Sequence, residues 1–434
     1  MKITPLDSWI NSKTGARGAS SLHGYQLELF RETLDFVKGA SRFYSEHLSS
    51  TCAAGINRLD DVRHIPFTLP EMLMRHPHDF VCVPPDDIGR IVTLPTSGTT
   101  GSPKRIFFTP GDQELTLDFF HHGMTTLADE NDRVMIFLPG KSEGSVGRLL
   151  RRSLERFGCE GVLYGPIYDY DDALQALAAS GATIAAGLPA QLFALSCIGP
   201  GIRLKSVLLC SDHVSQAVSL GLTKAWGCEV FSHYGMTESG LGGGVDCSAH
   251  SGYHMREADL LFEIIDPVSE APVPDGERGE IVFTTLTRRG MPLVRYRTGD
   301  MSYVIPGRCP CGSGLRRFGH ISGRIPDMVG FRADFTLSMP ILDEILFCVP
   351  GLLGFTADIG DDGGRDLLTI TIFSPGNEQA VQEAGTRIRN DRYLGEPIAG
   401  GLFEICIRHG GAGVLTYGNE KRNIVDRRQK RRTR

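Results

Sequence analysis

The chain has 434 residues, of which 41% are hydrophobic and 22% charged, an ordinary balance for a globular protein with more than one domain. Its formal net charge is −6, but residues 421–434 hold eight Lys or Arg against one Asp, a net +7, so the preceding residues carry −13. Such an acidic body argues against nucleic acid as a partner, and the basic end RRQKRRTR is typical of a solvated tail.

The expected location is the cytoplasm, with no membrane partner. No stretch approaches the ~18 uninterrupted apolar residues of a membrane-spanning helix. The first residues, MKITPLDSWINSKTGARG, lack the basic-then-apolar pattern of a secretory signal. The eleven Cys are scattered, unlike those of a disulfide scaffold, which fits a reducing compartment.

The first two thirds of the chain alternate between helical and strand-like patterns. Residues 24–47 carry apolar side chains at helical spacing, which predicts an amphipathic helix. Further along, strands are predicted at 132–140, 160–166 and 204–212, and helices at 145–158 and 169–181. Strands and helices in turn predict a mostly parallel α/β sheet.

After the loop at 233–240 the pattern changes. The runs LLFEIIDP, GEIVFTTL and PLVRYRTGD, separated by Pro and Gly turns, predict a β-rich layer. From about Met328 helical and strand patterns mix, which predicts a compact α+β domain of about 100 residues. The predicted fold is therefore α/β, with a large N-terminal domain (1–325) of mostly parallel α/β sheets plus a β-rich layer, and a small C-terminal α+β domain (326–434).

The stretch TSGTTGSPK, residues 96–104, concentrates glycine and hydroxyl residues just ahead of a lysine. Successive N–H groups of a Gly-rich turn form a nest for anionic oxygens, and glycine lets the backbone approach closely. The candidate phosphate ligands are Thr96, Ser97, Gly98, Thr99, Thr100, Gly101 and Lys104. A Walker loop is excluded, because the GK[ST] ending is absent and IFFT continues as a strand. A flexible surface loop is the alternative.

Three further segments accompany this loop: HYGMTESG at 233–240, RYRTGD at 295–300 and HISGRIPDMV at 320–329. In this order and spacing, the four segments resemble the adenylate-forming superfamily of acyl-CoA synthetases. Within it the chain is similar to the phenylacetate-CoA ligase family, on LELFRETLDFV, IPFTLPEML, TTLTRRGMPLVRYRTGD and CPCGSG. The resemblance covers about residues 24–428.

The resemblance implies an AMP-forming acid–thiol ligase. A carboxylic acid, phenylacetate-like and aromatic, would attack the α-phosphate of ATP, and the acyl-adenylate would then pass to the thiol of CoA. The loop at 96–104 would hold the β- and γ-phosphates, since catalysis of this kind is positioning plus charge stabilisation. Thr237 would contact the α-phosphate, and Glu238 would hold Mg²⁺, a cation that prefers oxygen ligands.

The resemblance also implies contacts to the rest of the nucleotide. Tyr234 and Gly235, with Met236 beside them, would flank the adenine and the acyl group. Asp300 would accept hydrogen bonds from the ribose hydroxyls, and Arg324 would bind the same region.

Three positions depart from the family's pattern. Where relatives carry Gly-Gly-Glu at the adenine, this chain has Cys210, Ser211 and Asp212. Pro326 occupies the pivot of the mobile C-terminal domain, and proline restricts φ, so we expect a pivot elsewhere, near 328–330, or a preference for the adenylating orientation. Lys421 is the nearest candidate for the catalytic lysine, with a plain surface lysine as the alternative.

Cysteines suggest a structural zinc site. Cys309 and Cys311 form a C-x-C pair in a Pro/Gly turn, with Cys247 and His254 across a predicted β segment. Three thiolates and one imidazole make a closed tetrahedral Zn²⁺ site. Free buried thiols are the alternative reading, and His250 is a rival fourth ligand.

The expected partners are a small carboxylic acid, ATP and CoA, and such folds commonly form homodimers. One alternative is an adenylating enzyme whose acceptor is an amine, a carrier thiol or a cofactor, as in deazaflavin-adenylating synthetases. Another is a non-catalytic nucleotide-binding protein, which retention of the Thr237/Glu238 pair disfavours.

Overall fold

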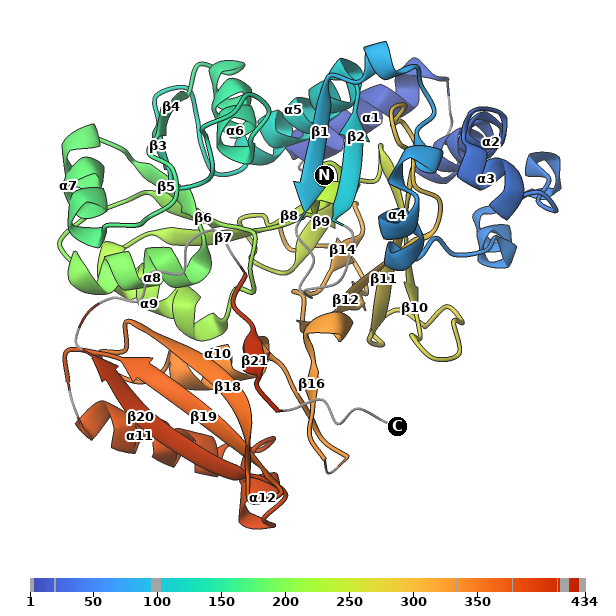
Figure 1. Cartoon of the computed structure of the whole chain (residues 1–434). Helices are drawn as coiled ribbons and strands as arrows, with labels where there is room; N and C mark the ends of the chain where they lie inside the picture. The colour runs from blue at the N-terminus through green and yellow to red at the C-terminus, as the bar shows by residue number, and fades with distance from the viewer. Residues whose placement is uncertain are drawn as a thin grey trace. The chain divides into compact units, whose positions relative to one another are not determined.

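The computed structural model describes residues 4–18, 21–94, 103–332, 334–376, 378–411, 413 and 421–428. The chain, whose helices and strands are labelled in Figure 1, divides by its contacts into two compact units, each assembled from several segments. The first unit comprises 1–131, 140–161 and 231–320, and the second comprises 132–139, 162–230 and 321–434. No helix among the described residues is long and apolar enough to cross a bilayer.

The first unit begins with helices. They are α1 (Pro5–Ala16), α2 (Leu22–Ala40), α3 (Arg42–His47), α4 (Pro70–Arg75), α5 (Pro110–Met124) and α6 (Val146–Glu155). The single helix expected over 24–47 is therefore two, because Ser41 adopts an extended backbone and its hydroxyl accepts the Tyr44 N–H as the N-cap of α3. Thr109 and Asp112 form a capping box that starts α5 directly after a strand.

The strands of the first unit are mainly antiparallel. They are β1 (Arg90–Leu94), β2 (Lys104–Phe108), β8 (Gly244–Val245), β9 (Tyr253–Met255), β10 (Leu260–Ile265), β11 (Gly279–Thr285), β12 (Tyr296–Ser302), β13 (Val304–Ile305) and β14 (Arg317–Phe318). Strand β7 (Glu229–Tyr234) enters this unit and pairs with β8. The predicted β-rich layer is the antiparallel set β10–β11–β12.

In the second unit, β3 (Arg133–Ile136), β5 (Ile184–Gly187) and β6 (Ser206–Leu209) pair in parallel. Every residue of β5 and β6 is buried, as is typical of strands covered on both faces. The remaining elements of this part are α7 (Tyr170–Ser180), α8 (Pro189–Ile198), α9 (Gln216–Trp226) and the second half of β4 (Glu160–Leu163), a strand that begins in the first unit. Gly181 and Gly227 end α7 and α9 in left-handed conformations.

The C-terminal part of the second unit is a small α+β domain. Its sheet has the order β20–β19–β18–β21, with an antiparallel β18–β19 pair between two parallel ones. Its elements are β15 (Gly323–Arg324), β16 (Val329–Gly330), β17 (Thr336–Leu337), α10 (Met339–Leu346), β18 (Gly354–Asp362), β19 (Arg365–Phe373), α11 (Glu378–Asn390), α12 (Gly395–Ala399), β20 (Glu404–Gly411) and β21 (Ile424–Asp426).

One hydrophobic core runs through the second unit. It includes buried side chains from α8 and α9 as well as from α10, β18 and β19. The rings of Phe193 on α8 and Phe347, which caps α10, meet edge to face with centroids 5.0 Å apart. The small C-terminal sheet therefore shares its apolar packing with the helices of residues 162–230.

The predicted fold class is confirmed: an α/β chain with parallel strands and a β-rich layer, followed by a small α+β domain. The two units defined by contacts are not divided at residues 325/326. The domain boundary predicted there therefore stays a prediction.

Candidate active site

The residues predicted to bind the nucleotide fall in both units, and each group is described within its own unit. The loop members Thr96, Ser97, Gly98, Thr99, Thr100 and Gly101 lie outside the described residues. The strands that flank the loop are described: β1 ends at Leu94, β2 begins at Lys104, and these two residues pair in the antiparallel register. Lys104 therefore stands at the fixed base of the loop.

Lys104 and Glu238 meet, although 134 residues separate them. The Lys104 Nζ donates to Glu238 Oε1 at 2.5 Å, and the Glu238 side chain is only 4% exposed. A third residue, Tyr296 on β12, joins them: its hydroxyl donates to the same Oε1 at 3.2 Å and accepts from Lys104 Nζ at 2.9 Å. A buried carboxylate is therefore compensated by a cation and a phenol.

The backbone around Glu238 is held by specific contacts. Thr237–Ser239 form a single 3-10 turn that ends at Gly240 in the left-handed conformation. The buried Arg288 donates to the Glu238 carbonyl oxygen at 2.7 Å. Burial lowers the pKa of Arg288 to about 10, so its guanidinium is charged at neutral pH.

Gly235 is required by this turn. A Cβ at that position would lie 2.3 Å from the Leu241 carbonyl oxygen, which is far inside van der Waals contact. Only glycine lets the chain after β7 fold back so closely on residues 240–243. Met236 closes the turn, since its carbonyl oxygen accepts the Leu241 N–H at 2.9 Å.

Tyr234 and Asp300 are brought together as well. The Tyr234 hydroxyl donates to Asp300 Oδ2 at 3.0 Å, and both residues are buried. The two motif segments 233–240 and 295–300 thus converge twice, through Tyr234–Asp300 and through Glu238–Tyr296. They present two carboxylates within one part of the first unit.

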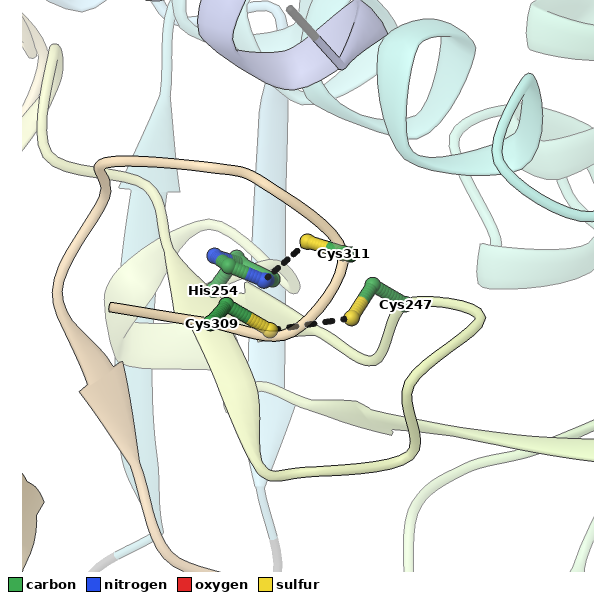
Figure 2. Close-up of side chains that lie close together, drawn as sticks. All are labelled: Cys247, His254, Cys309 and Cys311. Atoms are coloured by element: carbon green, nitrogen blue, oxygen red, sulfur yellow. Dashed lines mark hydrogen bonds between the residues drawn. The ribbon is translucent and has the colours of Figure 1, made fainter. Parts of the chain in front are cut away.

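The four predicted zinc ligands cluster in the first unit (Figure 2). The candidate ligand atoms of Cys247, His254, Cys309 and Cys311 all lie within 4.8 Å of one another. The Sγ atoms of Cys247 and Cys309 are 3.6 Å apart, and Cys311 Sγ is 3.5 Å from His254 Nε2. Burial lowers the pKa of His254, which keeps its imidazole neutral and able to bind a metal.

The rival ligand His250 lies elsewhere. Its Nδ1 is 3.3 Å from Asp246 Oδ2, and its ring packs against Phe231 at a centroid distance of 4.9 Å. The described group of possible metal ligands contains His254 and not His250.

In the second unit, Ser211 and Asp212 follow β6. Ser211 has φ 72°, a left-handed conformation that a residue other than glycine adopts at a cost. Glycine, which the family's pattern carries in this segment, would fit without strain. The structure thus accommodates Cys210–Asp212 in a backbone turn suited to glycine.

Asp212 has a cationic partner from the C-terminal segment. Arg422 Nε lies 3.5 Å from Asp212 Oδ2, and the Arg422 guanidinium donates to both oxygens of Asp343 on α10 at 2.6 and 2.5 Å. Burial raises the pKa of Asp343 to about 6, against the opposing effect of Arg422, and Asp212 adds to the rise. Neighbouring Lys421 is exposed.

Arg324 is half-buried at β15, and Pro326 is exposed in a short 3-10 turn, Ile325–Asp327. The predicted set lacked three residues that the structure places beside its members: Tyr296, Arg288 and Arg422. The first two stand inside the quoted run TTLTRRGMPLVRYRTGD, but only the three-dimensional pairing reveals what they contact. Arg422 follows Lys421, the predicted catalytic lysine, and nothing in the sequence indicates that Arg422 pairs with a buried carboxylate.

Comparisons with known proteins agree with the motifs. The family of AMP-binding enzymes matches residues 43–286. The phenylacetate-coenzyme A ligase of Thermus thermophilus is 27% identical over 324 residues, covering 72% of each chain. That of Pseudomonas putida is 26% identical over 341 residues, covering 75% of this chain and 76% of the relative. A crystal structure of 2-hydroxyisobutyryl-CoA ligase in its postadenylation state superimposes with a TM-score of 0.78 at 20% identity, covering 92% of this chain and 88% of that one.

The buried Arg422–Asp343 pair yields a stability prediction. Replacing Arg422 by Met leaves Asp343 buried without its cationic hydrogen-bond partner, which should cost about 3–5 kcal/mol of unfolding free energy. With its folded pKa already raised above the unfolded value, Asp343 favours the fold less as pH rises through about 6. Because Arg422 stabilises only the ionised form of Asp343, the loss measured by urea denaturation should be larger at pH 8, where that form predominates, than at pH 5.

A matched control is Arg365→Met. Arg365 pairs with Glu404 at 3.3 Å, but the two side chains are 69% and 49% exposed. Its removal should change stability little and with no such pH trend. Equal losses for the two variants would contradict the assignment of Arg422.

Proposed function

The chain belongs to the AMP-binding enzyme family and is an acyl-CoA ligase of the phenylacetate-CoA ligase type, and we propose that it activates an aromatic, phenylacetate-like acid. In this proposal the acid attacks the α-phosphate of ATP, releasing pyrophosphate, and CoA sulfur then displaces AMP from the acyl-adenylate. Phenylacetate is suggested by the names of the curated relatives. A non-CoA acceptor is not favoured.

The single observation that carries the proposal is the meeting of Lys104 with Glu238. The Lys104 ammonium at the base of the Gly-rich loop and the buried Glu238 carboxylate 2.5 Å away suit the binding of a metal–triphosphate. Lys104 can turn to a phosphate while Glu238 receives the metal ion. Mg²⁺, when bound, would neutralise phosphate charge. Asp300, already a hydrogen-bond acceptor for Tyr234, would accept from the ribose.

The other predicted roles remain part of the proposal. Residues of the 96–101 loop would hold the β- and γ-phosphates, Thr237 the α-phosphate, and Arg324 the ribose region. The nucleotide-facing set also includes Ser211, Asp212, Tyr234, Gly235 and Met236, and Lys421 is the proposed catalytic lysine.

The function is tested by acid-dependent ATP–pyrophosphate exchange over a panel of carboxylic acids, followed by thioester formation with CoA. Exchange with an aromatic acid and CoA-dependent product are expected. Glu238→Gln should lower the exchange rate roughly 10²-fold or more, by analogy with removal of one charge-stabilising group. Glu277→Gln, at an exposed glutamate of the same unit, should leave it unchanged.

Two results would count against the proposal. Exchange without any CoA-dependent product would select the alternative acceptor. No exchange with any acid would remove the enzymatic assignment of this site.

We also propose that residues 326–434 form the mobile domain and that Pro326 limits its rotation. Proline holds φ near −65° and restricts the residue before it, so a pivot there has less freedom. Pro326→Asp should speed thioester formation from preformed acyl-adenylate by several-fold and leave adenylation unchanged. Single-turnover measurements separate the two half-reactions.

Pro350→Asp is the control, because Pro350 is also exposed and lies in the same C-terminal part. Unchanged thioester formation in Pro326→Asp, or equal acceleration in both variants, would argue against the pivot assignment.

We further propose that Cys247, His254, Cys309 and Cys311 bind a structural zinc ion. The donor set fits, because three thiols and an imidazole converge within 4.8 Å, and His254 turns Nε2 toward Cys311 Sγ at 3.5 Å. Four protein ligands leave no open position, so the ion would link the β8–β9 region to the 309–311 turn.

Metal analysis of protein purified without added zinc should find about one zinc per chain, and Cys309→Ser should lose it. The melting temperature should fall in parallel, because the ion's binding energy is folding energy. Cys82→Ser removes a buried thiol of the same unit outside the cluster and should keep the metal. The site would be refuted if metal-free wild-type protein melted at the same temperature as wild-type protein supplied with zinc.

A further inference from the structure

Tyr296 is a buried polar group to which the motifs assign no role. It opens β12 and is 0% exposed, and its ring packs against Phe283 on β11 at a centroid distance of 5.5 Å. Its hydroxyl reaches two charged side chains of the candidate site, accepting from Lys104 Nζ and donating to Glu238 Oε1. The phenol thus uses its donor and its acceptor on two different catalytic candidates.

The three members of this network differ in how firmly they are held. Lys104 has a long flexible stem and adjoins the Gly-rich loop, and its side chain is 12% exposed. Glu238 sits in a one-turn 3-10 segment anchored by Arg288 through its backbone carbonyl. Tyr296 is packed inside strand β12, and the next residue, Arg297, pairs in register with Val282 of β11. The phenol is therefore the rigid member.

The rigidity of Tyr296 matters because the Lys104 ammonium cannot pair fully with the Glu238 carboxylate and with a phosphate at the same time. When Lys104 turns to a bound triphosphate, Glu238 loses the cation that compensates its burial, and a carboxylate without a partner would relax or swing. The Tyr296 hydroxyl, which already donates to Oε1, would remain available as a donor in that state. It would hold the carboxylate in its rotamer, with its charge directed at the incoming cation.

We propose that Tyr296 is a positioning residue that fixes the Glu238 carboxylate for the metal of the metal–nucleotide complex. The inference rests on the proposed function, since it assumes that Glu238 receives the divalent cation of ATP. It adds the partner that orients Glu238. Residues that hydrogen-bond a metal ligand in this way typically change metal affinity 10–100-fold when removed.

The test uses Tyr296→Phe in the full-length protein, with Mn²⁺ as a paramagnetic probe and the non-hydrolysable analogue α,β-methylene-ATP. The ring and its packing remain, and only the hydroxyl is lost. The Mn²⁺ concentration for half-saturation, measured by electron paramagnetic resonance, should rise roughly 10-fold or more. In steady state the Mg²⁺ requirement should rise while KM for the acid is unchanged.

Tyr44→Phe is the matched control. Tyr44 is equally buried in the same unit, and its hydroxyl also makes two hydrogen bonds, to the Thr68 hydroxyl at 3.0 Å and from the Val294 N–H at 2.9 Å. Losing them should lower stability and leave Mn²⁺ affinity unchanged. A merely structural Tyr296 would give the same pattern, and that result would overturn the proposal.

The outcomes separate the two levels of inference. Wild-type protein that binds Mn²⁺–nucleotide but shows no acid-dependent pyrophosphate exchange would refute the proposed reaction and leave the role of Tyr296 supported by the Mn²⁺ shift. Wild-type protein whose Mn²⁺ binding is not enhanced by the nucleotide analogue would overturn the role of Tyr296.

Discussion

The organisation of the site depends on one buried negative charge. Glu238 is 3% exposed, and an ionised carboxylate removed from water costs several kcal/mol unless charge and hydrogen bonds replace its hydration. Here the replacement comes from Lys104 and Tyr296, while Arg288 holds the backbone. Four segments of the first unit must therefore meet at one place: Lys104 and Tyr296 lie in β2 and β12, and Glu238 and Arg288 lie in the turns that follow β7 and β11.

Buried charge is handled in the same way elsewhere in the chain. Arg295, next to Tyr296, is 1% exposed; it forms a bidentate pair with Glu263 and donates to the carbonyl oxygens of Arg63 and Ile65. In the second unit Arg422 saturates Asp343. Each guanidinium joins parts of the chain far apart in sequence, and the fork of donors on Arg295 makes its pairing with Glu263 geometrically specific.

The departures from the family's pattern acquire a physical meaning in the structure. Ser211 occupies a left-handed turn where glycine would be unstrained, so the turn after β6 is imposed by its surroundings and not by its residue type. Asp212 there has an ion-pair partner in Arg422 from the C-terminal segment. This connection lies within the second unit, whose apolar core already joins α8 and α9 to α10.

Local sequence was sufficient for the elements and for the motifs. Period and capping signals placed α6, α7 and β6 within about three residues of their observed bounds, because those signals act over a few residues. They missed the break at Ser41, since a single hydroxyl cap interrupts an otherwise continuous apolar spacing. The C-x-C pair was likewise predicted from residue type and spacing to share a candidate metal site with Cys247 and His254, and the structure brings the four residues together.

The order of strands and helices, the α/β class and the residue types capable of binding phosphate, a hard cation or zinc can all be inferred from the amino-acid order. Which of these residues meet becomes clear only in the folded chain: Lys104 with Glu238, Tyr234 with Asp300, and His254 rather than His250 with the thiols. The fold also revealed Tyr296 and Arg422. The reason is that propensity and spacing act between neighbours in the chain, whereas these contacts join residues brought together only when strands pair and a common core closes.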